Sequence, residues 1–122
     1  MQWLAVFLGG GLGSVLRFGV NRLAVNMPLH YPWGTFFANI ISSFVLGMII
    51  GLSLQKSQFN PLLKLFFVTG LCGGFSTFST FSFETFRLLK EGNYLMGGIN
   101  ILTSIVFCLI AIGLGLALGK NL

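Results

Sequence analysis

Charged residues are what this chain of 122 residues has least of, since Asp, Glu, Lys and Arg together make up only 7% of it. A soluble globular domain carries about 25%. Hydrophobic residues account for 55% of the chain, and its mean hydropathy is +0.92. Such a chain cannot cover itself with a polar surface. The composition therefore argues against a soluble domain and predicts that the lipid bilayer surrounds this protein.

The few charges are mostly positive, with seven basic residues, two acidic residues and a net charge of +5. Nucleic-acid-binding proteins share this sign, but they gather Lys and Arg into a patch or a groove. Here the basic residues are sparse and lie near the ends of apolar segments, as membrane anchors do. No nucleic-acid partner is expected.

Cysteine and histidine are equally scarce. Cys72 and Cys108 lie in apolar surroundings, where cysteine usually acts as a small buried hydrophobe, so a disulfide or a metal–thiolate site has little support. His30 is the only histidine, and no pair of base and nucleophile is visible. We therefore expect no enzyme activity.

Four apolar segments are long enough to cross a bilayer, which requires about 20 residues. Their connections are short, so successive helices should be antiparallel neighbours. The sequence predicts an all-α integral membrane fold with a single four-helix domain over residues 1–122, with spans at about 3–25, 33–54, 61–89 and 94–118.

The third segment carries glycines, hydroxyl groups and phenyl rings where a membrane helix normally carries aliphatic side chains. Gly73-Gly74 predicts a break in this helix, which frees carbonyl oxygens that protein or an ion must satisfy. Two copies of the chain would bring two such breaks together, and the carbonyl groups of Gly73 and Ser76 could then hold a hard cation such as sodium. The alternative is a simple kink whose carbonyls neighbouring hydroxyls satisfy.

The basic residues barely specify an orientation. Arg17 lies too deep in its span to count. The other six basic residues fall three on each side of the membrane, namely Lys56, Lys64 and Lys120 against Arg22, Arg87 and Lys90. The positive-inside rule then has little to act on. This balance predicts dual topology and an antiparallel homodimer with a twofold axis in the membrane plane. Alternatively, one orientation prevails by a margin that the sequence does not reveal.

Four pairs of glycines stand four residues apart, the spacing that lets membrane helices approach closely. These pairs predict tight helix packing and agree with an oligomer, without identifying the partner of each face. They are Gly9 and Gly13, Gly47 and Gly51, Gly70 and Gly74, and Gly115 and Gly119.

Polar residues recur at helical spacing on the first two segments. Arg17 shares a face with small residues, and it either extends toward the lipid headgroups or faces a water-filled entrance that attracts anions. Thr35, Asn39 and Ser42 form a second stripe. Thr35 and Ser42 can bond back to their own helix, but Asn39 brings two N–H donors to mid-membrane depth. We favour a functional role for Asn39 over a helix–helix contact.

The last two segments add an aromatic pair and further donors. Phe78 and Phe81 share a face, with Ser79 and Thr80 displaced around the helix. The edge of a phenyl ring is positive, so rings presented edge-on beside hydroxyl groups form a lane for a small anion. Conduction requires binding that is weak enough for release, and no lysine interrupts this lane. On the fourth segment Asn100, Ser104, Cys108 and Ala111 line one face, and Thr103 lies off it as a structural residue.

These motifs resemble the Fluc/CrcB family of fluoride channels, small four-helix proteins that assemble as antiparallel dual-topology dimers. The resemblance covers the whole chain, and its third element is the most specific. The elements are Gly9-Gly10-Gly11-Leu12-Gly13 leading to Arg17, Gly34-Thr35-Phe36-Phe37-Ala38-Asn39, and the run from Gly70 to Phe81 followed by Glu84.

The resemblance implies two pores per dimer and passive export of fluoride from the cytoplasm across the bacterial plasma or inner membrane, where it relieves fluoride toxicity. It implies that Phe78 and Phe81 supply the paired rings and that Asn39 donates beside them. Ser79 and Thr80 then fall in a polar track with Glu84 near its outer end.

The resemblance also implies a structural sodium ion at the dimer centre, held by backbone oxygens of Gly73 and Ser76. On the fourth helix Ser104 matches the family pattern. Asn100 and Cys108 depart from it, because the family often has Tyr and Ser there, and their roles stay open.

Two rival classes fit less well. A small multidrug exporter also has four spans, but it needs a buried carboxylate in its first helix, and the acidic residues here are Glu84 and Glu91. A purely structural membrane subunit explains the glycines but not Asn39 and the aromatic–hydroxyl run.

Overall fold

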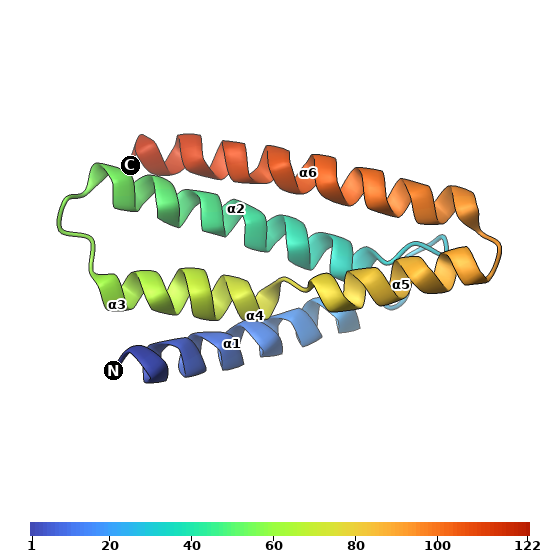
Figure 1. Ribbon diagram of the computed structural model, residues 1–122, viewed down its shortest axis with the longest axis horizontal. Helices are drawn as coiled ribbons and strands as arrows, with labels where there is room; N and C mark the ends of the chain where they lie inside the picture. The colour runs from blue at the N-terminus through green and yellow to red at the C-terminus, as the bar shows by residue number, and fades with distance from the viewer.

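The computed structural model describes all residues 1–122 and contains helices connected by short loops (Figure 1). The elements are α1 (Gln2–Leu23), α2 (Trp33–Gln55), α3 (Pro61–Lys64), the π-helical segment η1 (Leu65–Cys72), α4 (Gly73–Phe75), α5 (Phe78–Lys90) and α6 (Tyr94–Lys120). Four of the resulting helical stretches are long and apolar enough to cross a membrane: Gln2–Leu23, Trp33–Gln55, Pro61–Lys90 and Tyr94–Lys120. The predicted all-α fold with four spans is confirmed.

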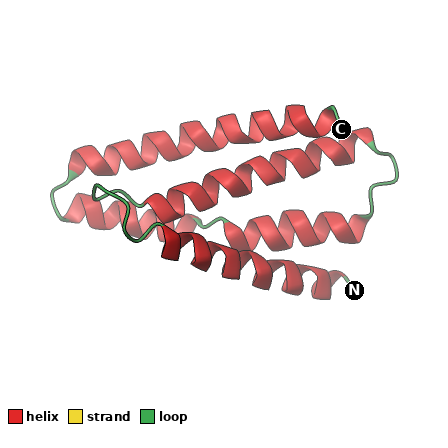
Figure 2. Ribbon diagram, turned by 180° about the vertical axis from the view of Figure 1, so that it is seen from behind, coloured by secondary structure: helices red, strands yellow, loops and turns green.

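The four spans alternate in direction. Both termini and the α2–α3 connection lie at one end of the bundle, and the α1–α2 and α5–α6 connections lie at the other (Figure 1). The view from behind shows the same elongated arrangement (Figure 2). The helices form two close pairs, α2 with α6 and α1 with the first half of the third span.

Local capping explains where three of the helices begin. The Asn60 side chain accepts a hydrogen bond from the Leu62 amide at 2.8 Å, with Pro61 in the first turn. Asn93 caps α6 in the same way. Thr77 caps α5, because its hydroxyl accepts from the Thr80 amide at 3.2 Å. These caps satisfy amides that have no partner within their own helix.

Burial in this chain is inverted relative to a soluble protein. The almost fully buried side chains include polar ones, such as Thr35 and Ser42 at 2% exposure and Asn100 at 1%. Large apolar side chains, such as Phe7 and Phe18 on α1, stay exposed. This distribution places hydrocarbon outside and hydrogen-bonding groups inside, as a bilayer requires.

The paired glycines contact one another within the chain. Gly9 and Gly13 of α1 lie against Gly70 and Gly74 of the third span, and a methyl group added at Gly13 would meet the backbone nitrogen of Phe75 at 2.8 Å. Small residues let these backbones approach where no hydrophobic force would hold them in lipid.

The second set of glycines works in the same way between α2 and α6. Gly47 and Gly51 face the α6 backbone, and Gly115 and Gly119 face the α2 backbone. The prediction of tight packing is confirmed. Because these faces are already occupied, however, the glycine pairs provide no support for an oligomer.

The third span is a single bent stretch from Pro61 to Lys90, and the predicted break at Gly73-Gly74 is wrong. Both glycines are helical, in α4. Helical geometry is lost three residues later, at Ser76 and Thr77, whose backbones are extended. Gly74 has a packing role instead, because a methyl group added there would collide with the backbone of Gly10 in α1.

Glycine contacts across the α2–α6 pair generate a stability prediction. We expect Gly115→Ala to lower the free energy of unfolding in detergent by about 1–3 kcal/mol, because the added methyl group collides with the α2 backbone near Phe44. Gly113→Ala is the matched control on the same helix, since a methyl group there meets nothing within 4 Å. Thermal or denaturant unfolding of the purified variants measures both, and equal stability of the two would contradict this account of the packing.

Candidate functional site

A cleft of about 250 Å³ lies at the bend of the third span, between α2, α5 and α6. It brings together four of the predicted pathway residues, Asn39, Phe78, Phe81 and Ser104, which come from three separate segments. Its full lining is Asn39, Ser43, Ser76, Thr77, Phe78, Phe81, Ser104, Ile105 and Cys108.

Asn39 holds the extended backbone at this bend. Its Oδ1 accepts from the Thr77 amide at 2.8 Å, and its Nδ2 donates to the Thr77 carbonyl at 3.3 Å. The Asn39 amide group therefore acts as a helix–helix contact, the alternative considered from the sequence. It still has a second N–H group beyond the one that Thr77 uses, and Asn39 lines the cleft. Both roles are compatible with this geometry.

Phe78 and Phe81 form the aromatic part of the cleft. Their ring centroids are 5.8 Å apart and their planes are inclined by 39°. Phe81 is half-buried, whereas Phe78 is 79% exposed and lies on the open side. Their common face was predicted from their spacing, and the structure places both rings in one cleft.

Ser79 and Thr80 are not among the residues that line this cleft. The Ser79 hydroxyl is 3.3 Å from the Thr77 hydroxyl, and the Thr80 amide donates to the same Thr77 oxygen. In a single chain these two residues lie beside the cleft, on the first turn of α5. Their place in a polar track stays a prediction.

Thr35 and Glu84 meet across the α2–α5 contact. The Thr35 hydroxyl, 2% exposed, donates to Oε1 of Glu84. Thr35 thus bonds to another helix rather than back to its own. It lies one helical turn before Asn39 on α2, so Glu84 is positioned next to the cleft and not inside it.

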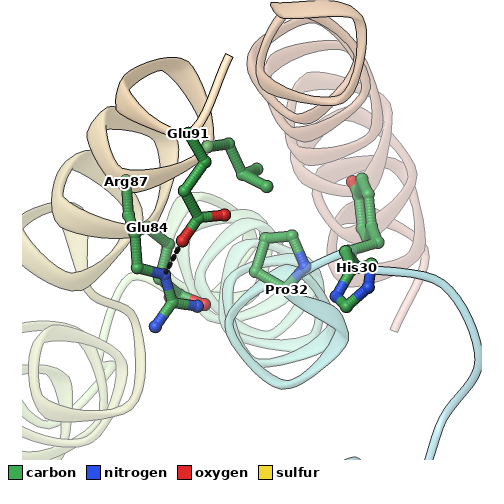
Figure 3. A pocket seen from close by; sticks show the side chains of 7 residues that line it. His30, Pro32, Glu84, Arg87 and Glu91 are labelled. Atoms are coloured by element: carbon green, nitrogen blue, oxygen red, sulfur yellow. Dashed lines mark ion pairs between the residues drawn. The ribbon is translucent and has the colours of Figure 1, made fainter. Parts of the chain in front are cut away.

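Glu84 also reaches a second cavity, of about 370 Å³, at the end of the bundle where α1 connects to α2 (Figure 3). There it lies beside Arg87 and Glu91, which form an ion pair with 3.9 Å between Nε and Oε1. The cavity is lined by His30, Tyr31, Pro32, Glu84, Arg87, Leu88 and Glu91. This cavity gives Glu84 a polar environment at one end of the spans. Its place at the outer end of a polar track stays a prediction.

Arg17 lies on α1, apart from the linings of both cavities. Its side chain is in no ion pair, and its carbonyl accepts from the Asn21 side chain at 3.1 Å. The structure brings it to neither the Phe78–Phe81 pair nor Glu84. Its role, at a water-filled entrance or at the lipid headgroups, stays a prediction.

The fourth helix presents the predicted face inward. Asn100, Ser104 and Ala111 are buried and Cys108 is half-buried. Ser104 and Cys108 reach the cleft, and Asn100 lies one turn below Ser104. Thr103 lies off this face and pairs with the Tyr31 hydroxyl at 2.6 Å, which agrees with a structural role.

Sequence reasoning missed several residues of the cleft. Ser43 follows Asn39 by four residues, so helical spacing alone could have identified it. Ile105 gives no signal in so apolar a helix. Thr77 stood within the aromatic–hydroxyl run, but its role depends on its backbone, which meets Asn39 only in the folded chain.

Two carbonyl groups at the bend lack their usual helical partners. In an uninterrupted helix the Gly73 carbonyl would accept from the Thr77 amide, but that amide donates to Asn39. The Ser76 carbonyl would accept from the Thr80 amide, which instead donates to the Thr77 hydroxyl. The Cys72 carbonyl, by contrast, keeps its helical partner, the Ser76 amide at 3.0 Å, and also accepts from the Ser42 and Ser76 hydroxyls at 2.9 and 2.8 Å. The Gly73 and Ser76 carbonyls are therefore the two at the bend whose usual helical amides have turned to other acceptors.

Comparison with known proteins places this chain in a described family. Residues 4–116 match the model of the family described as "CrcB-like protein, Camphor Resistance (CrcB)". A relative from Gloeothece citriformis is 43% identical over 99% of this chain and 98% of its own length. One from Azobacteroides pseudotrichonymphae is 44% identical over 90% of this chain and 89% of its own.

A relative from Pyrococcus abyssi is 38% identical over 97% of this chain and 95% of its own length. All three relatives carry the name fluoride-specific ion channel FluC. The family also confirms the expectation that the chain is not an enzyme, because its named members are ion channels. The match over residues 4–116 and the relatives that cover nearly the whole chain show that this multi-pass membrane protein belongs to the CrcB-like family.

Proposed function

We propose that this protein is a fluoride channel that lets fluoride leave the cytoplasm passively and so relieves fluoride toxicity. The observation that carries the proposal is the cleft, which combines the Phe78–Phe81 pair with the Asn39 amide in a chain whose relatives are named fluoride-specific channels. By the same family relation we place it in the bacterial plasma or inner membrane.

The chemistry of the cleft suits a small anion that must lose water and still be released. Asn39 and Ser104 offer neutral N–H and O–H groups, and the rings of Phe78 and Phe81 offer positive edges. No Lys or Arg lines this cleft. A full positive charge in hydrocarbon would hold fluoride too strongly for conduction, whereas neutral donors replace water at similar strength.

We further propose that two copies assemble as an antiparallel dual-topology homodimer with two pores. Two observations support this. The cleft is open on the outside of one chain, with Phe78 79% exposed there, so a second copy can supply the missing wall. Apart from Arg17, which lies within α1, the basic residues are also balanced between the two ends of the bundle, which allows both orientations.

A sodium ion at the dimer centre is the third part of the proposal. The Gly73 and Ser76 carbonyls lack their helical partners, and carbonyl oxygens are ligands that hard cations accept. Bound there, sodium would accept these carbonyl oxygens of both subunits as ligands and fix the two bends against each other.

Removal of sodium tests this part of the proposal. Replacing sodium by N-methylglucamine on both sides of the membrane should lower fluoride flux several-fold. Undiminished flux would contradict a role for the ion.

Fluoride release from liposomes tests the proposed function directly. Vesicles that contain the purified protein and a fluoride gradient should empty rapidly, whereas chloride-loaded vesicles should empty no faster than protein-free ones. A fluoride electrode and a chloride electrode measure the two rates. Equal release of both ions would contradict fluoride selectivity, and release of neither would contradict channel function.

Phe81→Ile tests the aromatic pair. The substitution keeps an apolar side chain but removes the polarised ring edge, so we expect fluoride flux to fall about tenfold, equivalent to ~1.4 kcal/mol. Phe83→Ile on the same helix is the control, because Phe83 is exposed and lies outside the cleft lining. Liposome flux measures both variants, with size-exclusion chromatography to confirm that assembly is unchanged. Equal flux in the two variants would reduce the Phe81 ring to a packing role.

Antiparallel assembly predicts that each end of the bundle is found on both sides of the membrane. The native thiols are first removed by Cys72→Ser and Cys108→Ser. In that background, the thiol introduced by Lys56→Cys should react with an impermeant maleimide added outside intact cells in about half of the copies. Lys90→Cys, at the opposite end, should give the complementary half. Labelling of all copies at one end and none at the other would exclude dual topology.

A further inference from the structure

A chain of buried hydrogen bonds connects the two walls of the cleft. The Ser104 hydroxyl donates to Oδ1 of Asn100 at 3.3 Å, and Nδ2 of Asn100 donates to the Thr85 hydroxyl at 2.9 Å. The Thr85 hydroxyl in turn donates to the Phe81 carbonyl at 2.8 Å. The three polar side chains are between 1% and 6% exposed. The three hydrogen bonds therefore all run in the same direction, from a donor on the α6 side to an acceptor on the α5 side.

Both ends of this series of hydrogen bonds are cleft residues. Thr85 lies one turn after Phe81 on α5, and Ser104 lies one turn after Asn100 on α6. Phe81 and Ser104 line the cleft, whereas Asn100 and Thr85 do not. The Asn100–Thr85 bond is also the only side-chain hydrogen bond between α5 and α6. Asn100 thus provides the one side-chain link between the two walls beside the cleft.

We infer that Asn100 is a positioning residue for conduction: it binds Thr85 and Ser104 and so keeps Phe81 and Ser104 in register across the cleft. This inference rests on the proposed function and adds to it a residue that the family pattern left without a role. Asn100 touches no transported ion in this account. It acts by fixing the distance between a ring edge on α5 and a hydroxyl on α6.

The direction of these hydrogen bonds also determines how the Ser104 hydroxyl can bind an anion. While Ser104 donates to Asn100, its hydroxyl hydrogen is engaged and is not offered to the cleft. Its bond to Asn100 is the longest of the three and therefore the weakest. The hydroxyl can rotate to donate to an arriving anion and return afterwards. Asn100 Oδ1 thus serves as the resting acceptor for a donor of the pathway.

The test compares Asn100→Leu, Thr85→Val and the double variant. Each single substitution removes the same interhelical bond, so each should lower fluoride flux about tenfold, and the double variant should be no worse than the lower single one. Thr85→Ser keeps the hydroxyl and should restore flux to within about twofold of the unaltered protein. Thr103→Val is the matched control on α6, because it removes a hydroxyl that bonds to Tyr31 and Ile99 away from the cleft.

A second readout does not depend on fluoride conduction. Cys108 lines the cleft, whereas Cys72 is 4% exposed, so the rate at which a small charged methanethiosulfonate labels Cys108 reports the shape of the cleft. Peptide mass spectrometry separates the two sites. We expect the labelling rate to change at least about threefold in Asn100→Leu and Thr85→Val and to stay unchanged in Thr85→Ser and Thr103→Val.

The two readouts separate failure of this inference from failure of the proposed function. If the unaltered protein conducts fluoride but neither flux nor Cys108 labelling responds to Thr85→Val, or if the two losses simply add, Asn100 has no positioning role. If the unaltered protein conducts no fluoride, the proposed function fails, and Cys108 labelling still decides whether Asn100 shapes the cleft. If Asn100→Leu does not fold, the Thr85→Val and Thr85→Ser pair decides the question.

Discussion

Backbone amide and carbonyl groups in hydrocarbon must find partners within the protein, and at the bend of the third span Asn39 provides them to Thr77. This pairing allows Ser76 and Thr77 to leave helical geometry at mid-membrane depth. The bend starts α5 in a new direction, so that Phe78 and Phe81 face α2 and α6 across a cleft. It also diverts the amides that would occupy the Gly73 and Ser76 carbonyls. One side-chain amide thus connects the aromatic pair with the carbonyl groups proposed to hold sodium.

The rest of the chain forms a close-packed frame around this bend. Two rows of glycines bring α1 onto the third span and α2 onto α6, with backbone against backbone. Polar side chains then occupy the interior, and each buried one has a hydrogen-bond partner. In lipid this arrangement is stabilising because an unpaired polar group would meet no water. The frame leaves one side of the cleft open, where a second copy is proposed to close it.

Neutral side chains that form hydrogen bonds recur in the cleft and next to it. Thr35 binds the Glu84 carboxylate, Asn39 binds the bend, and Asn100 binds Ser104 and Thr85. Charged side chains gather instead at the second cavity, where Arg87 and Glu91 pair at the end of the bundle (Figure 3). The separation places full charges near the membrane surface and dipoles along the proposed path. It is consistent with a channel that binds its ion weakly at every point.

Composition and periodicity alone determined the membrane class, the four spans and the common face of Phe78 and Phe81, because these depend on local spacing and on the cost of exposing charge to lipid. The same spacing predicted an inward face for Asn100 and Ser104. Where the third span bends was decided only by the tertiary structure. Gly73 and Gly74 have the freedom to unwind, but both stay helical, and Gly74 packs against Gly10 of α1. The backbone leaves helical geometry at Ser76 and Thr77 instead, where Asn39 can bind the Thr77 amide and carbonyl. The roles of Thr77, Thr85 and Asn100 were equally hidden, since each depends on a partner at least 15 residues away in the chain. Sequence pattern shows which residues can share a helix face, but which polar groups satisfy one another depends on how the helices pack.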